Sequence, residues 1–121
     1  MPSRLVPHPR LCASQEQLQR LREPIALPIL ATAARTVAAE AKACLKSEHI
    51  DYDPTVHNAH LIRARIMQGR VVTLLTQYVR SGQKRFRDAA VRHVWEMDRW
   101  THWSWIAARN HQNHPNDIFD L

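Results

Sequence analysis

Apolar residues recur at helical spacing through the second half of the chain. Between residues 71 and 79, one arc of the helical wheel holds Val71, Val72, Leu74, Leu75, Tyr78 and Val79. Apolar positions three and four residues apart are typical of one face of an α-helix. The pattern predicts helices over 56–80 and 84–103, joined by a tight turn with Gly82 just past the first helix end. The two helices should therefore form an antiparallel hairpin.

Both helices of this hairpin carry apolar residues on more than one side. The main face of the second helix holds Phe86, Ala89, Ala90, His93, Val94, Met97 and Trp100, and its reverse face holds Val91, Trp95 and His102. In the first helix, Ile62 and Ile66 lie opposite the main arc. A hairpin with two apolar sides expects neighbours on both, as in layered helical arrays and toroids. We therefore expect either a piece of a larger helical assembly or a homo-oligomer formed through exposed apolar helix faces.

The first half of the chain predicts two further helices. Ser14 and Gln17 have the spacing of a capping box, which favours a short helix over 14–23. Pro28 suits the first position of a second helix, over 28–47. One face of that helix consists of Leu30, Ala34, Val37, Ala38, Ala41, Cys44 and Leu45. Because alanine side chains are small, this face predicts a close approach between helices.

These elements predict an all-α fold of antiparallel helical hairpins, which we interpret as an incomplete (α/α) toroid. Residues 1–121 then form a single helical domain or fragment, with an extended segment at 1–13 and a loop or tail at 104–121. The polar tail is typical of a loop that leads into more protein, so we expect a fragment. The chain has only two glycines, which argues against a turn-rich all-β fold and against a glycine loop around phosphate.

The chain is basic, with 14 arginines, three lysines and a formal net charge of +6. Such a charge favours an anionic partner: nucleic acid, an acidic polysaccharide or an acidic protein surface. Because the arginines are scattered, a solvated surface is the simpler alternative. No apolar run reaches the length of a membrane span, so we expect no membrane partner, and no signal peptide is expected. Cys12 and Cys44 lack the spacing of a zinc or redox motif and predict free thiols, with Cys44 packed.

Histidines supply the candidate acid–base and metal chemistry. His93 lies within an apolar helix face. It is either a base or ligand in a desolvated pocket or, as we favour, a core histidine hydrogen-bonded to a neighbouring helix. The pairs His57/His60 and His111/His114 each offer two metal ligands, but neither has the HExxH pattern. We expect no metal site, no cofactor and no catalytic residue in this chain.

All four tryptophans fall within residues 95–105, and this cluster supplies the candidate binding site. Trp103 and Trp105, followed by Arg109 and His111, form the predicted substrate-binding set, a rim on which a sugar stacks. The chemical reason is that aromatic faces combine apolar area with a polar edge. The alternative, which we favour, is that these tryptophans pack the end of the hairpin against further helices.

Three stretches carry short motifs whose order is informative. His-Pro-Arg-Leu at 8–11 is followed by SQEQLQRLRE at 14–23. At 71–103, VVTLLTQYVRSGQKRFRDAAVRHVWEMDRWTHW has an apolar helix ending at Tyr, a Gly-containing turn, and an Asp-Ala-Ala helix that runs into Trp. The chain closes with HPNDIFDL at 114–121. In this order the motifs resemble the start of the helical domain of heparinase II/III-like polysaccharide lyases and their alginate-lyase relatives.

The resemblance implies an N-terminal (α/α) toroid followed by a β-sandwich, in proteins that are commonly periplasmic or secreted. It also implies cleavage of acidic polysaccharides by β-elimination. In that reaction a Tyr or His removes the C5 proton of a uronic acid, while Asn, Arg or His groups stabilise its carboxylate. The family's catalytic groups come from later helices and the second domain, so this chain is not expected to be active alone. The alternative function is a small basic helical module that binds nucleic acid or an acidic protein, with nucleic acid the less favoured partner.

Overall fold

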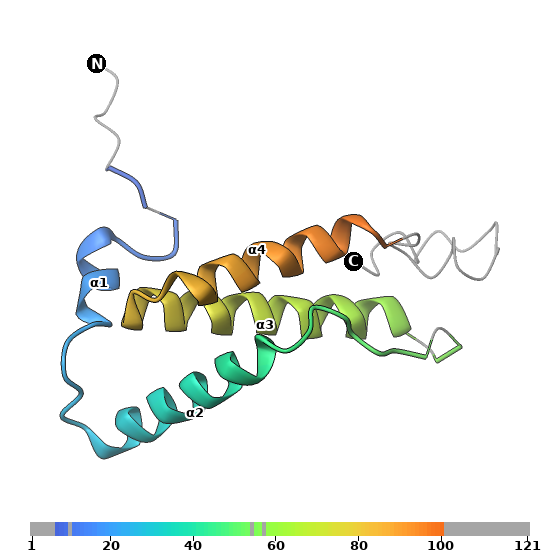
Figure 1. Ribbon diagram of the computed structural model, residues 1–121. Coiled ribbons are helices and arrows are strands. Elements are labelled where there is room, and N and C mark those ends of the chain that lie inside the picture. The colour runs from blue at the N-terminus through green and yellow to red at the C-terminus, as the bar shows by residue number, and fades with distance from the viewer. Residues whose placement is uncertain (1–6, 10, 54, 57, 101–121) are drawn as a thin grey trace.

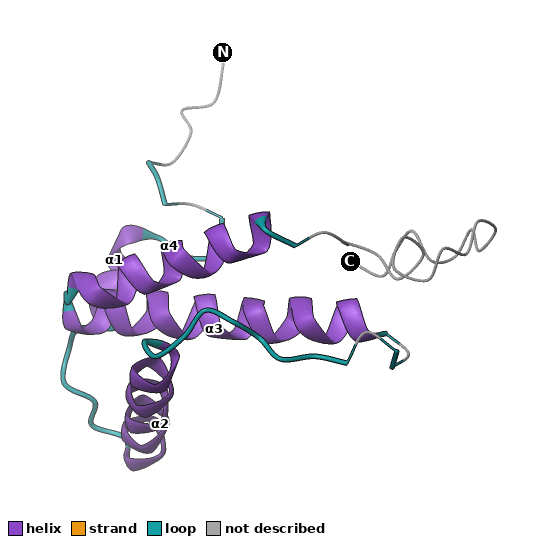
Figure 2. Ribbon diagram, turned by 45° about the vertical axis from the view of Figure 1, so that its right-hand side comes forward, coloured by secondary structure: helices purple, strands orange, loops and turns teal. Residues whose placement is uncertain are grey.

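The computed structural model describes residues 7–9, 11–53, 55–56 and 58–100, which fold into four helices (Figure 1). The helices are α1 (Gln15–Arg20), α2 (Pro28–Cys44), α3 (Ala59–Ser81) and α4 (Lys84–Asp98). No strand occurs within the described ranges, which confirms the all-α prediction. In both ribbon views α3 lies between α4 and α2, and α1 lies beside the end of α3 at which the hairpin turns (Figures 1 and 2).

The turn between α3 and α4 satisfies the last carbonyl groups of α3. Gly82 has a φ of 71°, the left-handed region that glycine enters without steric cost. Its N–H donates to the Tyr78 carbonyl at 2.7 Å, and the Ser81 hydroxyl donates to the Gln77 carbonyl at 2.7 Å. These bonds end α3 at Ser81, and α4 begins at Lys84 and returns along it as an antiparallel partner.

The core lies at the seam between α3 and α4, and α2 closes it from one side. Its buried residues are Ala41, Leu74, Phe86, Ala89 and Ala90. Packed against them are the half-buried side chains of Cys44, Leu45, Val71 and Tyr78. Three of the buried residues, Ala41, Ala89 and Ala90, have only a methyl side chain, so the helices approach closely here. The predicted close approach between helices is therefore found at Ala41, whereas Leu30, at the start of the same predicted face, is 52% exposed.

The first two helices end earlier than predicted. The capping box of α1 is confirmed, because Ser14 Oγ accepts from the Gln17 N–H at 3.2 Å and Gln17 Oε1 accepts from the Ser14 N–H at 2.8 Å. However, α1 ends at Arg20 rather than residue 23, and the backbone then bonds to carbonyls three residues back as tighter turns. In the same way, α2 ends at Cys44 rather than residue 47.

The hairpin helices also differ from the predicted ranges. α3 begins at Ala59 rather than residue 56, because Asn58 has a φ of 60° and so leaves the helical path. α4 ends at Asp98, and the N–H groups of Arg99 and Trp100 bond to carbonyls three residues back. The remainder of the predicted helix, 101–103, and the tail at 104–121 lie outside the described residues.

The buried stripe of the hairpin is narrower than the apolar arcs of its sequence. Val72 is 57% exposed and Val94 is 52% exposed, so placing them on the buried main faces is wrong. Leu75 is exposed as well, at 41%. The reason is that each helix buries only the residues that face its partner, and α2 covers just one further side. The exposed Ile62 and Ile66 lie elsewhere on α3, so apolar side chains are uncovered on more than one flank.

Candidate functional site at the open end of the hairpin

The open end of the hairpin, where α3 begins and α4 ends, is the part of the described structure nearest in sequence to the tryptophan cluster. The predicted substrate-binding residues Trp103, Trp105, Arg109 and His111 lie outside the described residues. Within the described part, Trp95 lies on α4 and is 64% exposed. In the helical wheel it belongs to the reverse face of this helix. The described residues around the start of α3 and the end of α4 therefore form the candidate site.

An arginine lies between two aromatic rings at this end. The guanidinium carbon of Arg63, on the first turns of α3, lies 4.1 Å from the ring centre of Tyr52 and 3.9 Å from that of Trp100. Tyr52 belongs to the connector before α3, and Trp100 follows α4. A cation close to the face of an aromatic ring is attracted by the negative potential of that face. Arg63 thus links the connector and the start of α3 to the end of α4, which comes much later in the sequence.

His60 completes the cluster from the same face of α3. An Arg63 terminal nitrogen lies 3.3 Å from His60 Nδ1, and since a guanidinium can only donate, Nδ1 accepts this contact. The His60 ring also lies 5.6 Å from the Tyr52 ring, tilted by 59°. We therefore assign His60 the tautomer that carries its proton on Nε2, because Nδ1 provides the lone pair.

The polar side chains of this cluster, Arg63 and His60, are buried, so they are not accessible to a ligand on the surface. Arg63 is only 6% exposed and His60 only 2%, and burial lowers the pKa of Arg63. The Tyr52 and Trp100 rings take the place of water against the guanidinium and reduce the cost of burying its charge. An arginine enclosed in this way is a structural link. It fixes the position of Trp100, from which the chain runs on into the remaining tryptophans.

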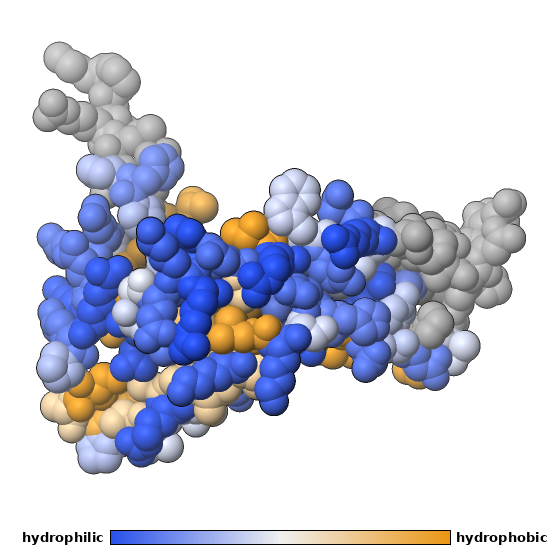
Figure 3. All heavy atoms as spheres, in the orientation of Figure 1, coloured by the Kyte–Doolittle hydropathy of each residue, from blue (hydrophilic) through white to orange (hydrophobic). Residues whose placement is uncertain are grey.

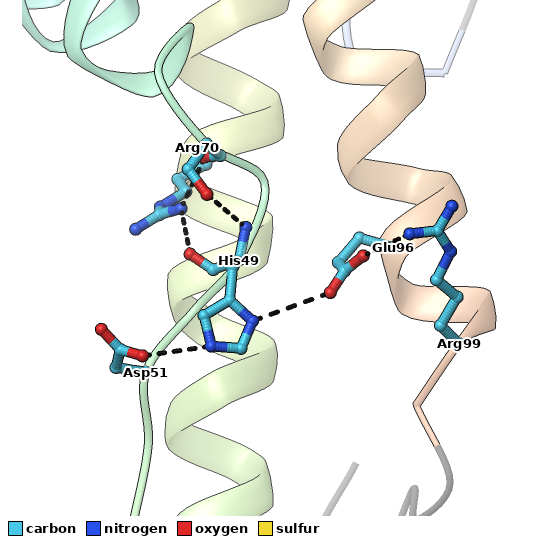
Figure 4. A network of polar contacts seen from close by, with 6 residues as sticks. His49, Asp51, Arg70, Glu96 and Arg99 are labelled. Carbon is cyan, nitrogen blue, oxygen red and sulfur yellow. Dashed lines mark hydrogen bonds and ion pairs between the residues drawn. The ribbon is translucent and has the colours of Figure 1, made fainter.

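The connector between α2 and α3 is fastened to both helices of the hairpin (Figure 4). Arg70 on α3 donates to the carbonyl groups of Ser47 and His49 at 3.3 and 3.2 Å. The His49 ring lies between two carboxylates, with Nε2 3.1 Å from Asp51 and Nδ1 3.9 Å from Glu96 on α4. The connector is thus held between α3 and α4 by main-chain and side-chain contacts together.

A second ion pair joins the connector to α4. Arg92 Nε donates to Glu48 Oε1 at 2.6 Å, and this hydrogen bond is the main reason why the pKa of Glu48 lies below its ordinary value. Partly exposed ion pairs stabilise a fold by only about 0–1 kcal/mol each. Their joint effect is to set the path of the connector, and this path brings Tyr52 over Arg63.

His93 is buried in the hairpin seam, as predicted for a core histidine, but its hydrogen bond differs from the prediction. Nδ1 lies 2.7 Å from the carbonyl oxygen of Ala89, four residues earlier on the same helix, so Nδ1 donates to α4 itself. The prediction that His93 bonds to a neighbouring helix is therefore wrong for Nδ1. Cys12 is exposed, Cys44 is half-buried, and both are free thiols.

Of the two histidine pairs considered as metal ligands in the sequence, the structure describes only His60. His60 is placed in the arginine cluster, whereas His57, His111 and His114 lie outside the described residues. Across the placed part of the chain, no group of three or more histidine, cysteine, aspartate or glutamate side chains could hold a metal ion. Likewise, none of the placed helices is both long and apolar enough to cross a bilayer.

Reasoning from the sequence did not identify Tyr52 and Arg63 as site residues. Arg63 stands between apolar residues of a helix, where an arginine is ordinarily expected to point into solvent. One usable signal was its spacing of three from His60, which places both side chains on one helix face. Tyr52 comes from the connector before α3 and Trp100 from the segment after α4, and no local pattern indicates either partner.

Comparisons with known proteins identify no relative of this chain. No family model, curated protein or solved structure matches the chain. The resemblance to polysaccharide lyases therefore rests on the motifs of the sequence.

Proposed function

We propose that this chain is the N-terminal helical part of a polysaccharide-lyase-like protein that acts on acidic, uronate-containing glycans by β-elimination. In this proposal the chain contributes part of an (α/α) toroid and binding surface, while the catalytic groups come from elsewhere. The single observation that supports it best is the two-sided apolar hairpin. Its exposed apolar residues are Ile62, Ile66, Val72, Leu75, Val91, Val94 and Trp95.

Exposed apolar side chains are costly in water when they are grouped on one surface. Single exposed apolar residues are common on protein surfaces, but a group of them on two packed helices marks a surface that another element covers. In a toroid each helical hairpin packs between neighbouring hairpins, so both flanks are apolar. The α3–α4 hairpin has this character, whereas the hairpin of an isolated three-helix bundle needs only one apolar flank.

The charge and the described chemistry favour binding without catalysis. A net charge of +6 attracts polyanions, and carboxylates along a uronate polymer are suitable partners for arginine. β-Elimination needs a base that reaches a substrate proton. Of the described histidines, His60 and His93 are buried, His49 is exposed but contacts the carboxylates of Asp51 and Glu96, and His8 is exposed.

The test measures binding and cleavage separately on the full chain. We expect retention of the protein by polygalacturonate or alginate in affinity electrophoresis, weakening as salt is added, and no retention by neutral dextran. Ultraviolet absorbance of unsaturated uronate should not increase when the chain alone is added. Equal retention by dextran, or no retention by either polyuronate, would contradict the proposal. Tighter salt-sensitive binding to duplex DNA would favour the basic nucleic-acid-binding module instead.

A further inference from the structure

A basic groove lies at the opposite end of the molecule from the Arg63 cluster. It is formed by the α1–α2 connector, α2 and the last turns of α3, and its volume is about 540 Å³, within the range of small-ligand sites. The polar side chains that line it are Arg22, Glu23, Arg35, Gln77, Arg80 and Ser81. In Figure 3, hydrophobic atoms lie at the lower left, over the start of α2, and hydrophilic atoms cover the region of α1 above them.

Main-chain contacts hold two of the three arginines in place. Arg22 Nε donates to the carbonyl of Val79 at 2.7 Å, and Arg80 Nε donates to the carbonyl of Leu21 at 3.2 Å. Each guanidinium keeps its terminal N–H groups for another acceptor. Arg35 donates to a side chain of its own helix at 2.9 Å. Among the placed residues, these three arginines make no ion pair with a carboxylate.

We infer that this groove binds the carboxylate of a uronate residue, with Arg22, Arg35 and Arg80 as its partners; the inference rests on the proposed function for the class of glycan. A guanidinium can donate two parallel hydrogen bonds to one carboxylate, a geometry that a point charge cannot match. The fixed Nε contacts of Arg22 and Arg80 reduce the side-chain freedom lost on binding. Three guanidiniums against one carboxylate, Glu23, leave the groove with a surplus of positive charge.

The other wall of the groove suits a sugar ring better than a larger planar group. Ala31, Ala34 and Ala38 of α2 line it with methyl groups, and Ile25 of the connector adds an apolar side chain. None of the described aromatic rings lines the groove, so recognition by these residues depends on charge and hydrogen bonds from Gln77 and the arginines. This composition predicts a preference for uronate over neutral sugars of the same size.

The experiment follows backbone amide signals of the full chain by NMR during titration with trigalacturonate. We expect shifts at Ala34, Arg35, Arg80 and Ser81, and none of comparable size with maltotriose. Arg35→Glu should weaken binding about three- to tenfold, because it replaces an attraction by a repulsion at a partly solvated site. Glu23→Gln should strengthen it by about twofold, because it removes the opposing charge.

Arg65→Glu is the matched control, since it makes the same charge change on α3 outside this groove. It should alter the affinity by less than about twofold. Equal weakening by Arg35→Glu and Arg65→Glu, or no effect of Glu23→Gln, overturns the assignment. Equal shifts with inorganic sulfate at the same concentration would overturn the preference for a uronate.

The two proposals fail in different ways. If polygalacturonate retains the chain while the groove amides do not respond to trigalacturonate, the groove assignment is overturned and the proposed function stands. If the groove amides respond to trigalacturonate while no polyuronate retains the chain, the proposed function is overturned and the groove assignment stands. Circular dichroism of each variant should match that of the unchanged chain, since Arg35, Glu23 and Arg65 are exposed.

Discussion

Replacing Ala41 by leucine tests whether α2 packs as closely on the hairpin as the structure shows. Ala41 is fully buried in the same cluster as Leu74, Phe86 and Ala89. Leucine adds three carbon atoms to a site where the helices already touch, and such overpacking costs about 1–3 kcal/mol. If the site had room, the added groups would instead stabilise the fold by about 0.8 kcal/mol per carbon. The sign of the effect therefore reports the space around Ala41.

We expect Ala41→Leu to lower the unfolding free energy by about 2 kcal/mol. In a folded region of this size, that corresponds to a fall in Tm of about 8–16 °C. Thermal unfolding followed by far-ultraviolet circular dichroism measures it. The matched control is Ala39→Leu, which makes the same change at an exposed position of α2 and should alter stability by less than about 0.5 kcal/mol. An unchanged or raised Tm for Ala41→Leu relative to this control would refute the close packing.

Two further predictions concern titration and thiol reactivity. Because the hydrogen bond from Arg92 lowers the pKa of Glu48 in the fold, this pair stabilises the fold above about pH 4.5, and the stabilisation is lost as the pH falls through the lowered pKa. Glu48→Gln should therefore reduce stability at neutral pH by less than about 1 kcal/mol and have no effect in acid, and an equal loss at both pH values would contradict this. Burial raises the pKa of Cys44, so this thiol should react slowly with a disulfide reagent in the folded protein. The exposed Cys12 should react quickly, and Cys44 should react as quickly once urea unfolds the chain. Two equally fast reactions in the native protein would disprove the burial of Cys44.

The features that were predictable depend on residues within one helical turn of each other. The capping box needs only Ser14 and Gln17, and the turn of the hairpin needs only Gly82 at the end of α3. The helical spacing of apolar residues could not predict how much of each apolar arc is buried by neighbouring helices. His93 and Val94 are neighbours on the predicted main face, yet His93 is buried and Val94 is 52% exposed. The difference arises because α3 covers only part of that arc.

The candidate sites depend on contacts that no local pattern specifies. The guanidinium of Arg63 lies against the rings of Tyr52 and Trp100, and the ion pair between Glu48 and Arg92 helps to hold the connector that carries Tyr52.

In the basic groove, Arg22 binds the carbonyl of Val79 while Arg80 binds that of Leu21, a reciprocal pair of bonds between segments almost sixty residues apart. The amino-acid sequence alone determined the presence and order of the helices, the capping box of α1, the glycine turn after α3 and the net charge, because these follow from neighbouring residues. The grouping of three arginines in one groove required the packing of α1 and α2 against α3, since only that packing brings their guanidiniums to the same surface.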